Sequence, residues 1–151
     1  MNAVVCETIT CTPSPPGSEV GDLGRYASTA LTADGLRVIA TYDTTYRNLV
    51  LVTEREDGTR RKEILDGARL ENDALVDTDS GRFPAVAVHK DTVHVVWHDA
   101  DAGELRYTTK AQGQMAEIVR VDGMGSAIRG THTSIAVGDD GVVHVAYRDE
   151  T

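Results

Sequence analysis

Three segments of the chain repeat one pattern, and this repeat constrains the fold more than any other feature. The segments are GRYASTALTADGLRVIATYD at 24–43, GRFPAVAVHKDTVHVVWHD at 81–99 and GTHTSIAVGDDGVVHVAYRD at 130–149. Each contains two runs of apolar and β-branched residues on either side of a turn that carries Asp, and in two copies Asp-Gly, which is typical of a β-hairpin. The repeat therefore predicts a series of similar hairpins.

A second hairpin follows the first two copies. The expected strands are 26–32, 36–42, 49–56 and 60–65 in the first copy and 83–89, 92–98, 104–110 and 115–121 in the second. The first strand of each copy is almost entirely small or apolar, which is typical of burial on both faces. Four antiparallel strands that recur about every 50 residues match a β-propeller blade. We therefore expect an all-β protein with about three four-stranded blades.

The second strand of the middle copy alternates in a way that agrees with this arrangement. A strand that packs between two neighbouring blades needs apolar or adaptable side chains on both faces. One face carries Val93, Val95 and Trp97, and the other carries His94, Val96 and His98. Because Trp97 and Tyr147 align with Thr41 in the repeat, we expect the two aromatic side chains to fill space between blades.

The two ends of the chain are expected to share one blade. The third copy has only two strands before residue 151, and segment 4–9 has the pattern and spacing of the outer strands 49–54 and 105–110. The predicted organisation is an outer hairpin of the shared blade at 1–23, the first blade and a linking insertion at 24–80, the second blade at 81–129, and the inner strands of the shared blade at 130–151.

The number of blades predicts how the ring closes. Propellers have about 4 to 8 blades, so three blades are too few to close within one chain. Two chains related by a two-fold axis would give a six-bladed ring, and cyclic symmetry of this kind is common. We therefore expect a homodimer. The alternative is that the chain belongs to a longer propeller that further sequence would close.

Composition limits the classes of partner. The net charge is −9, which argues against binding to nucleic acids and anionic membranes. The sequence has no apolar stretch that could span a membrane, and it lacks a basic region followed by an apolar run at its start, which gives a slight preference for the cytoplasm. Cys6 and Cys11 are expected to be free thiols, although a disulfide between them stays open.

The longest connection, at 67–80, is expected to contain a short helical turn and to cover the channel mouth, because long loops in compact domains are often functional. Two short Asp-rich segments, DTDSG at 77–81 and DADAG at 99–103, lack the remaining ligands of a calcium loop and are interpreted as turns. Motifs for zinc, phosphate or a nucleophilic serine are absent. The sequence predicts neither a metal site nor a cofactor.

Propeller topology brings strand starts and strand ends together at one face, around the channel mouth. The starts of the first strands supply Arg25, Tyr26, Arg82, Phe83, Thr131 and His132, and the ends of the second strands supply Tyr42, Asp43, His98, Asp99, Arg148 and Asp149. These residues are the candidate ligand-binding set. His132 and His98 are the candidate acid–base residues, because histidine titrates near neutral pH.

Several of these residues also have structural interpretations. Asp43, Asp99 and Asp149 occupy one repeat position, where an aspartate commonly accepts hydrogen bonds from the amides of the next turn. Arg25 and Arg82 would hold a carboxylate or phosphate through bidentate hydrogen bonds, or they would pair with aspartates between blades. Both interpretations stay open.

The repeat also resembles a known family. The pattern G-x-x-x-S-x-A-x-x-x-x-G-x-x-H-V-A-Y-x-D, followed by L-x-Y, resembles repeats of bacterial sialidase-like (BNR-like) β-propellers, and it is clearest at 134–149 and 93–107. This resemblance implies the propeller fold. The sialidase Asp-box S-x-D-x-G-x-T-W is absent, and of the arginine triad only Arg25 and Arg82 have matches, with Thr131 at the third position. The half-ring also looks like small lectins that assemble six-bladed rings, although it lacks their Trp-rich sugar pockets.

Three functions remain open at this stage. The first is binding of a carbohydrate or a small anionic ligand at the channel mouth. The second is a lyase or hydrolase that uses His132 or His98 together with an arginine. The third is a platform for protein interactions. A deep pocket where His132, Arg25 and Arg82 meet would favour the enzyme, whereas shallow pockets repeated between blades would favour a lectin.

Overall fold

The computed structural model describes residues 21–67, 69–71, 74–76, 78–123 and 128–150. All regular structure in these residues is β-strand, so the all-β expectation is confirmed. The described residues contain no helix that is long and apolar enough to cross a membrane. Segment 4–9, Cys6 and Cys11 lie outside the described residues.

The first sheet contains four antiparallel strands in sequential order, as the repeat predicts. They are β1 (Arg25–Leu31), β2 (Arg37–Asp43), β3 (Asn48–Glu54) and β4 (Arg60–Asp66). The β1–β2 turn closes with Gly35 N–H donating to the carbonyl of Thr32 at 3.0 Å, and the hydroxyl of Thr32 accepts from the amide of Leu36 at 2.9 Å. The turn residues therefore satisfy their own backbone groups, as the sequence pattern indicated.

The second sheet differs from the expectation in its outermost strand. It contains β7 (Ser80–His89), β8 (Thr92–Asp99) and β9 (Glu104–Ala111), followed by two pieces that both pair with β9, β10 (Gln114–Met115) and β11 (Val119–Asp122). The single strand expected at 115–121 is wrong. The Thr108 hydroxyl donates a hydrogen bond to the carbonyl of Ala116 at 2.9 Å. This side-chain bond competes with the regular backbone hydrogen bonds between the strands, and the outermost strand is interrupted there.

The third sheet contains β12 (Arg129–Val137) and β13 (Val143–Asp149) in the described part of the chain. The insertion forms a short hairpin from β5 (Arg69–Glu71) and β6 (Ala74–Val76), so the expected helical turn is wrong. Antiparallel pairing of two three-residue segments satisfies backbone groups that a single turn of helix would leave open.

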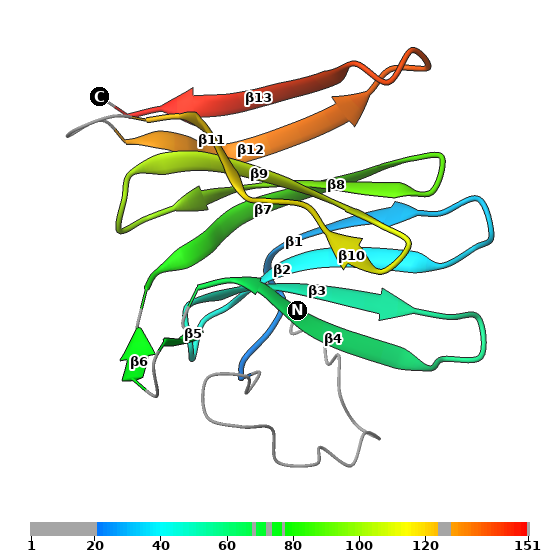
Figure 1. Cartoon of the computed structure of the whole chain (residues 1–151), viewed down its shortest axis with the longest axis horizontal. Coiled ribbons are helices and arrows are strands. Elements are labelled where there is room, and N and C mark those ends of the chain that lie inside the picture. Colours follow the sequence, from blue (N-terminus) through cyan, green and yellow to red (C-terminus); the bar gives the residue numbers. More distant parts are fainter. Residues whose placement is uncertain (1–20, 68, 72–73, 77, 124–127, 151) are drawn as a thin grey trace.

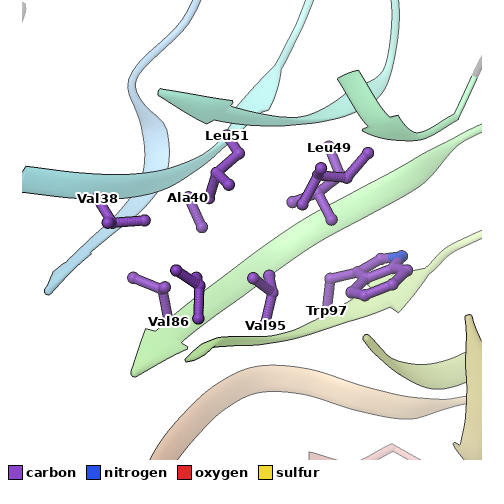
Figure 2. Close-up of a cluster of buried hydrophobic side chains, with 9 residues drawn as sticks. Val38, Ala40, Leu49, Leu51, Val86, Val95 and Trp97 are labelled. Atoms are coloured by element: carbon purple, nitrogen blue, oxygen red, sulfur yellow. The ribbon is translucent and has the colours of Figure 1, made fainter. Parts of the chain in front are cut away.

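The three sheets stack face to face, and the tight turns of their first hairpins lie at the same end of the stack (Figure 1). A core of buried side chains fills the space between the first and second sheets, with β2 and β3 on one side and β7 and β8 on the other (Figure 2). Its buried members are Val38, Ala40, Leu49, Leu51, Leu65, Val86, Val93, Val95 and Trp97.

A smaller core joins the second and third sheets. It is built on Ala85, Val96 and Leu105, and Ile135 and Val145 of the third sheet pack against it. The alternation expected for β8 is therefore confirmed, because Val95 and Trp97 face the first sheet while Val96 faces the third.

The indole N–H of Trp97 places a polar group inside the first core. The indole is fully buried, and its N–H donates to Ser80 Oγ at 3.0 Å and to Asp66 Oδ2 at 3.1 Å. The Ser80 hydroxyl donates to the same carboxylate at 2.7 Å, and Arg106 approaches it at 3.2 Å. These bonds satisfy the buried polar atoms at the place where the two sheets meet. The expectation that Trp97 fills space between sheets is confirmed, whereas Tyr147 is 37% exposed.

The glycine that opens each repeat sets how closely consecutive sheets approach. A Cβ on Gly81 would lie 2.4 Å from the amide nitrogen of Leu49, and a Cβ on Gly130 would lie 2.8 Å from Cβ of Leu105. Leu49 and Leu105 are the second residues of β3 and β9, the third strands of the preceding sheets. The same glycine-to-strand contact therefore fixes both sheet interfaces.

We predict that Gly81→Ala destabilises the protein far more than Gly58→Ala. Gly81 has a φ of 125° and Gly58 a φ of 81°, so alanine at either position would introduce backbone strain of about 1 kcal/mol. Only Gly81 also meets backbone atoms of another sheet, while nothing lies within 4 Å of a Cβ on Gly58. Denaturant unfolding should show a loss of about 3 kcal/mol or more for Gly81→Ala. Equal losses in the two variants would contradict the contact.

Candidate functional site

Three side chains at one repeat position share a rare backbone conformation. Tyr26, Phe83 and His132 have φ angles of 57°, 51° and 53°. This left-handed conformation costs an ordinary residue about 1–2 kcal/mol, and large aromatic residues seldom adopt it. The same strain is thus retained three times within one small protein.

A β-bulge at the start of each innermost strand produces this conformation. In β1 the pairing steps from Arg25 opposite Tyr42 to Ser28 opposite Ala40, so one extra residue is inserted on β1. The same step occurs between Arg82 and Ala85 in β7 and between Thr131 and Ser134 in β12. A bulge of this kind re-aims a side chain, and here it re-aims the aromatic residue after the Arg or Thr of each repeat.

The three re-aimed rings contact one another in turn: Phe83 and His132 are stacked, whereas Tyr26 is tilted by 40° against Phe83. The centroids of Tyr26 and Phe83 are 4.2 Å apart, and those of Phe83 and His132 are 4.4 Å apart with an interplanar angle of 27°. We call Tyr26, Phe83 and His132 the aromatic arc. It borders a pocket of about 350 Å³ whose other lining residues are Ala27, Ser28, Pro84, Ala85, Val86, Thr133, Ser134 and Ile135. The pocket therefore runs along the innermost strands of all three sheets.

Hydrogen bonds between the innermost strands hold the arc in place. Ser28 Oγ accepts from the amide of Val86 at 3.2 Å, which ties β1 to β7. The Thr133 hydroxyl donates to the carbonyl of Phe83, which ties β12 to β7. The residues next to the rings are thus fixed by polar contacts, and all three rings line the pocket.

Arg82 is held by a buried carboxylate. Its Nε donates to Asp79 Oδ1 at 3.0 Å, its Nη2 pairs with Asp79 Oδ2, and the hydroxyl of Tyr42 donates to Asp79 Oδ1 at 2.9 Å. The bond to Asp79 raises the pKa of Arg82. Burial, followed by the bond to Asp79, raises the pKa of Tyr42. Arg82 therefore pairs with an aspartate, but with one three residues earlier in the chain and not with an aspartate of another sheet, as the structural interpretation expected.

The other arginines of the candidate set lie apart from the pocket lining. Arg25 is exposed, with its Cζ 5.1 Å from the ring centroid of Tyr26. Arg148 is exposed and lies 3.6 Å from a carboxylate oxygen of Glu150. Neither they nor Arg82 line the pocket beside the arc, so the structure does not bring His132, Arg25 and Arg82 together in one cavity.

The three repeat aspartates are engaged in local contacts. Asp43 Oδ1 accepts from the amides of Thr45 and Tyr46 at 2.9 and 3.2 Å. Asp99 Oδ1 accepts from the amide of Ala102 at 2.9 Å, and its Oδ2 lies 2.7 Å from Arg106 Nη1. Asp149 pairs with Arg129. For Asp43 and Asp99 these are the turn contacts of the structural interpretation.

The structure separates the two candidate acid–base histidines. His132 is exposed in the aromatic arc. His98 is buried, and its Nδ1 lies 2.6 Å from the carbonyl oxygen of Arg129, so it joins β8 to the start of β12. His98 does not line the pocket.

A larger pocket, of about 540 Å³, lies along the outer strands β4, β9 and β11. Its charged residues neutralise one another, since Arg106 lies 3.1 Å from Glu104 and 3.2 Å from Asp66, and Arg120 lies 3.4 Å from Glu104. We assign this region to stabilisation of the sheet interface, although this pocket is larger than the one beside the aromatic arc.

Sequence reasoning named each ring of the arc but missed their mutual contact, the Asp79 partner of Arg82 and the strand-tying role of Ser28 and Thr133. A signal for the arc was present, since each repeat glycine is followed by Arg or Thr and then by Tyr, Phe or His. A glycine directly before such a pair is compatible with a bulge.

No model of a known protein family matches the chain. No curated protein matches it either. Within the residues that the structure describes, no group of three or more His, Cys, Asp or Glu side chains is arranged to hold a metal ion.

We predict that His94 makes the protein less stable at acidic pH. Burial, and to a smaller extent repulsion from His89, lowers the pKa of His94 below its ordinary value of 6.5. The unfolded chain therefore binds this proton more readily, so the stabilising contribution is complete above about pH 6.5 and declines as the pH falls toward the folded-state pKa.

Urea unfolding at pH 8 and pH 5 tests this. His94→Gln should reduce the loss of stability between the two pH values, and His89→Gln should reduce it by less, because His89 is the smaller cause. An unchanged pH dependence in His94→Gln would contradict the assignment.

Proposed function

We propose that this chain is a ligand-binding β-propeller protein and that its aromatic arc binds a carbohydrate. One observation carries the proposal: three rings in mutual contact, each in a left-handed backbone conformation, border a pocket on the innermost strands. Strain that is retained at one place indicates a functional demand on that place. Packing alone would not require the same unfavourable conformation in three repeats.

The propeller assignment is supported by the way the sheets are arranged. Antiparallel sheets repeat along the chain, pack face to face and place β1, β7 and β12 next to one another as innermost strands. The bulge recurs at the same position of each innermost strand. The sialidase-like resemblance of the repeat fits this proposal as a statement about fold.

The chemistry of the pocket favours a sugar over an anion. Aromatic rings that line a pocket offer apolar surface to the C–H groups of a sugar ring, and such pockets add a few polar groups for orientation. Ser134 and His132 provide polar groups on an exposed strand segment. Arg82 is already paired with Asp79 and Arg148 lies near Glu150, so these cations are poorly placed to attract an anionic ligand.

The alternative of an enzyme receives less support from the geometry. The residues that line the pocket include one imidazole, that of His132, and no carboxylate. General acid–base catalysis generally needs a second titratable group within reach of the substrate. The ligand-binding function is the one that the arc supports best.

Phe83→Asn is the variant that tests the proposal. Asparagine tolerates the left-handed conformation better than most residues, so the backbone should keep its shape while the central ring is removed. We expect sugar binding to weaken by about 10-fold or more, which corresponds to about 1.4 kcal/mol. Phe83→Tyr keeps the ring and should keep the affinity.

The measurement is a screen of neutral mono- and oligosaccharides on a glycan array, followed by calorimetric titration of the sugars that bind. Met115→Asn is the matched control, because Met115 is 41% exposed on β10 and lies outside the pocket. If no sugar binds, or if Phe83→Asn binds as tightly as the unsubstituted protein, the proposal is wrong. A parallel screen of small carboxylates and phosphates, with Arg25→Gln, tests the anionic alternative.

A further inference from the structure

We infer that a second copy of this chain docks head to tail on the stack of sheets, closes a six-bladed ring and completes the aromatic arc. The assembly itself is argued from the outer faces of the first and third sheets. The shared ligand site that results rests on the proposed function.

The free face of the first sheet is equivalent to faces that are buried elsewhere in the chain. By repeat position, Thr29, Leu31, Arg37 and Ile39 correspond to Val86, Val88, Val93 and Val95 of the second sheet. In the second sheet these positions pack against the preceding sheet. In the first sheet Leu31 is 66% exposed, and together with Thr29, Ala30, Arg37 and Ile39 it lines a groove of about 370 Å³.

The free face of the third sheet shows the complementary half of the same pattern. Ser134, Ala136, His144 and Ala146 are exposed. They correspond to Ala85, Ala87, His94 and Val96 of the second sheet, of which Ala85, His94 and Val96 are buried. In the first sheet two of the equivalent positions, Val38 and Ala40, are fully buried against the second sheet.

These two faces fit each other, because the chain already joins their equivalents twice. The first interface packs Val38 and Ala40 against Val86 and Val95, and the second packs Ala85 and Val96 against Ile135 and Val145. A third contact of the same kind would place Ala136 and Ala146 of one copy against the equivalent face of another, around Leu31 and Ile39. The small side chains of β12 and β13 leave room for the larger residues on the first sheet.

The two faces cannot meet within one copy. They lie at opposite ends of the stack, with β1 and β2 in one outer sheet and β12 and β13 in the other (Figure 1). Rings of about 4 to 8 blades are stable, so two copies of three sheets close a ring while three copies would exceed this range. A two-fold axis through the ring makes both contacts identical.

Closure changes the ligand site. In a single copy, the contacting rings run from Tyr26 through Phe83 to His132 and then end. In the ring, His132 of one copy would lie next to Tyr26 of the second copy, so six rings would surround one axis. We therefore expect one ligand for every two chains.

The experiment measures mass in solution by sedimentation equilibrium. The chain has a mass of 16.2 kDa, and the unsubstituted protein should have twice this mass. Leu31→Glu on the first sheet and Ala136→Arg on the third sheet should each give monomers, because every contact in the ring uses both faces. Val119→Arg, at a position 46% exposed on β11, is the matched control and should remain dimeric.

Mixing the two variants identifies the head-to-tail geometry. Leu31→Glu keeps an intact third-sheet face and Ala136→Arg keeps an intact first-sheet face, so a mixture should form open dimers through one native contact. A dimer that joins two first-sheet faces would survive Ala136→Arg. Because Leu31 is already exposed, Leu31→Glu still tests the inference if Ala136→Arg fails to fold.

The outcomes separate assembly from function. Two results would overturn the ring: an unsubstituted protein that is monomeric at about 50 µM (well above a micromolar dissociation constant), or single variants that both remain dimeric. A monomeric protein would instead favour the alternative that further sequence of a longer propeller covers the exposed faces of the first and third sheets. If the dimer forms and no sugar binds, the ring stands and the proposed function fails. If sugar binds a monomer and Phe83→Asn abolishes it, the function stands and the ring fails.

Discussion

Contact between the glycine that opens a sheet and the strand of the sheet before it governs how closely the sheets of this protein stack. Gly81 lies against Leu49 and Gly130 against Leu105, with no room for a Cβ at either place. This close approach brings the apolar faces of consecutive sheets into contact and buries both cores. Because hydrophobic stabilisation grows with the apolar area removed from water, a wider spacing would weaken every other contact between the sheets.

The same contact lies close to two of the three strained aromatic residues. Gly81 and Gly130 stand two residues before Phe83 and His132, so the contact fixes the chain where these two innermost strands begin. Strain of about 1–2 kcal/mol at each of Tyr26, Phe83 and His132 is similar in size to the gain of about 0.5–1.5 kcal/mol from each contact between aromatic rings. The surrounding sheet contacts hold the conformation, and the contacts between the rings offset part of its cost.

Sequence patterns predicted the strands because alternation and turn residues act locally. The faces of Val95, Trp97 and Val96 followed from period-two alternation alone. The broken strand after β9 was missed because it depends on a bond from the Thr108 side chain to a distant carbonyl, and the hairpin β5–β6 because short segments carry little periodicity. Of the candidate set, Tyr26, Phe83 and His132 line the pocket beside the innermost strands. Their contact depends on which strands become neighbours, and spacing along the chain does not encode that. The Arg82–Asp79 pair is local, three residues apart, and was missed although the spacing was available.

Repetition of the backbone with variation of the side chain gives the arc its chemical character. The bulge and the left-handed φ are the same in all three sheets, while the ring changes from a phenol to a phenyl to an imidazole. A purely structural cluster would be served equally well by three identical apolar rings. The change from Tyr26 to His132 instead sets a different hydrogen-bonding group at each end of an apolar centre. The proposed ligand, a sugar, has the matching features, because its apolar face is bordered by hydroxyl groups that both donate and accept. The proposal therefore depends more on the sequence differences within the repeat than on the repeat itself.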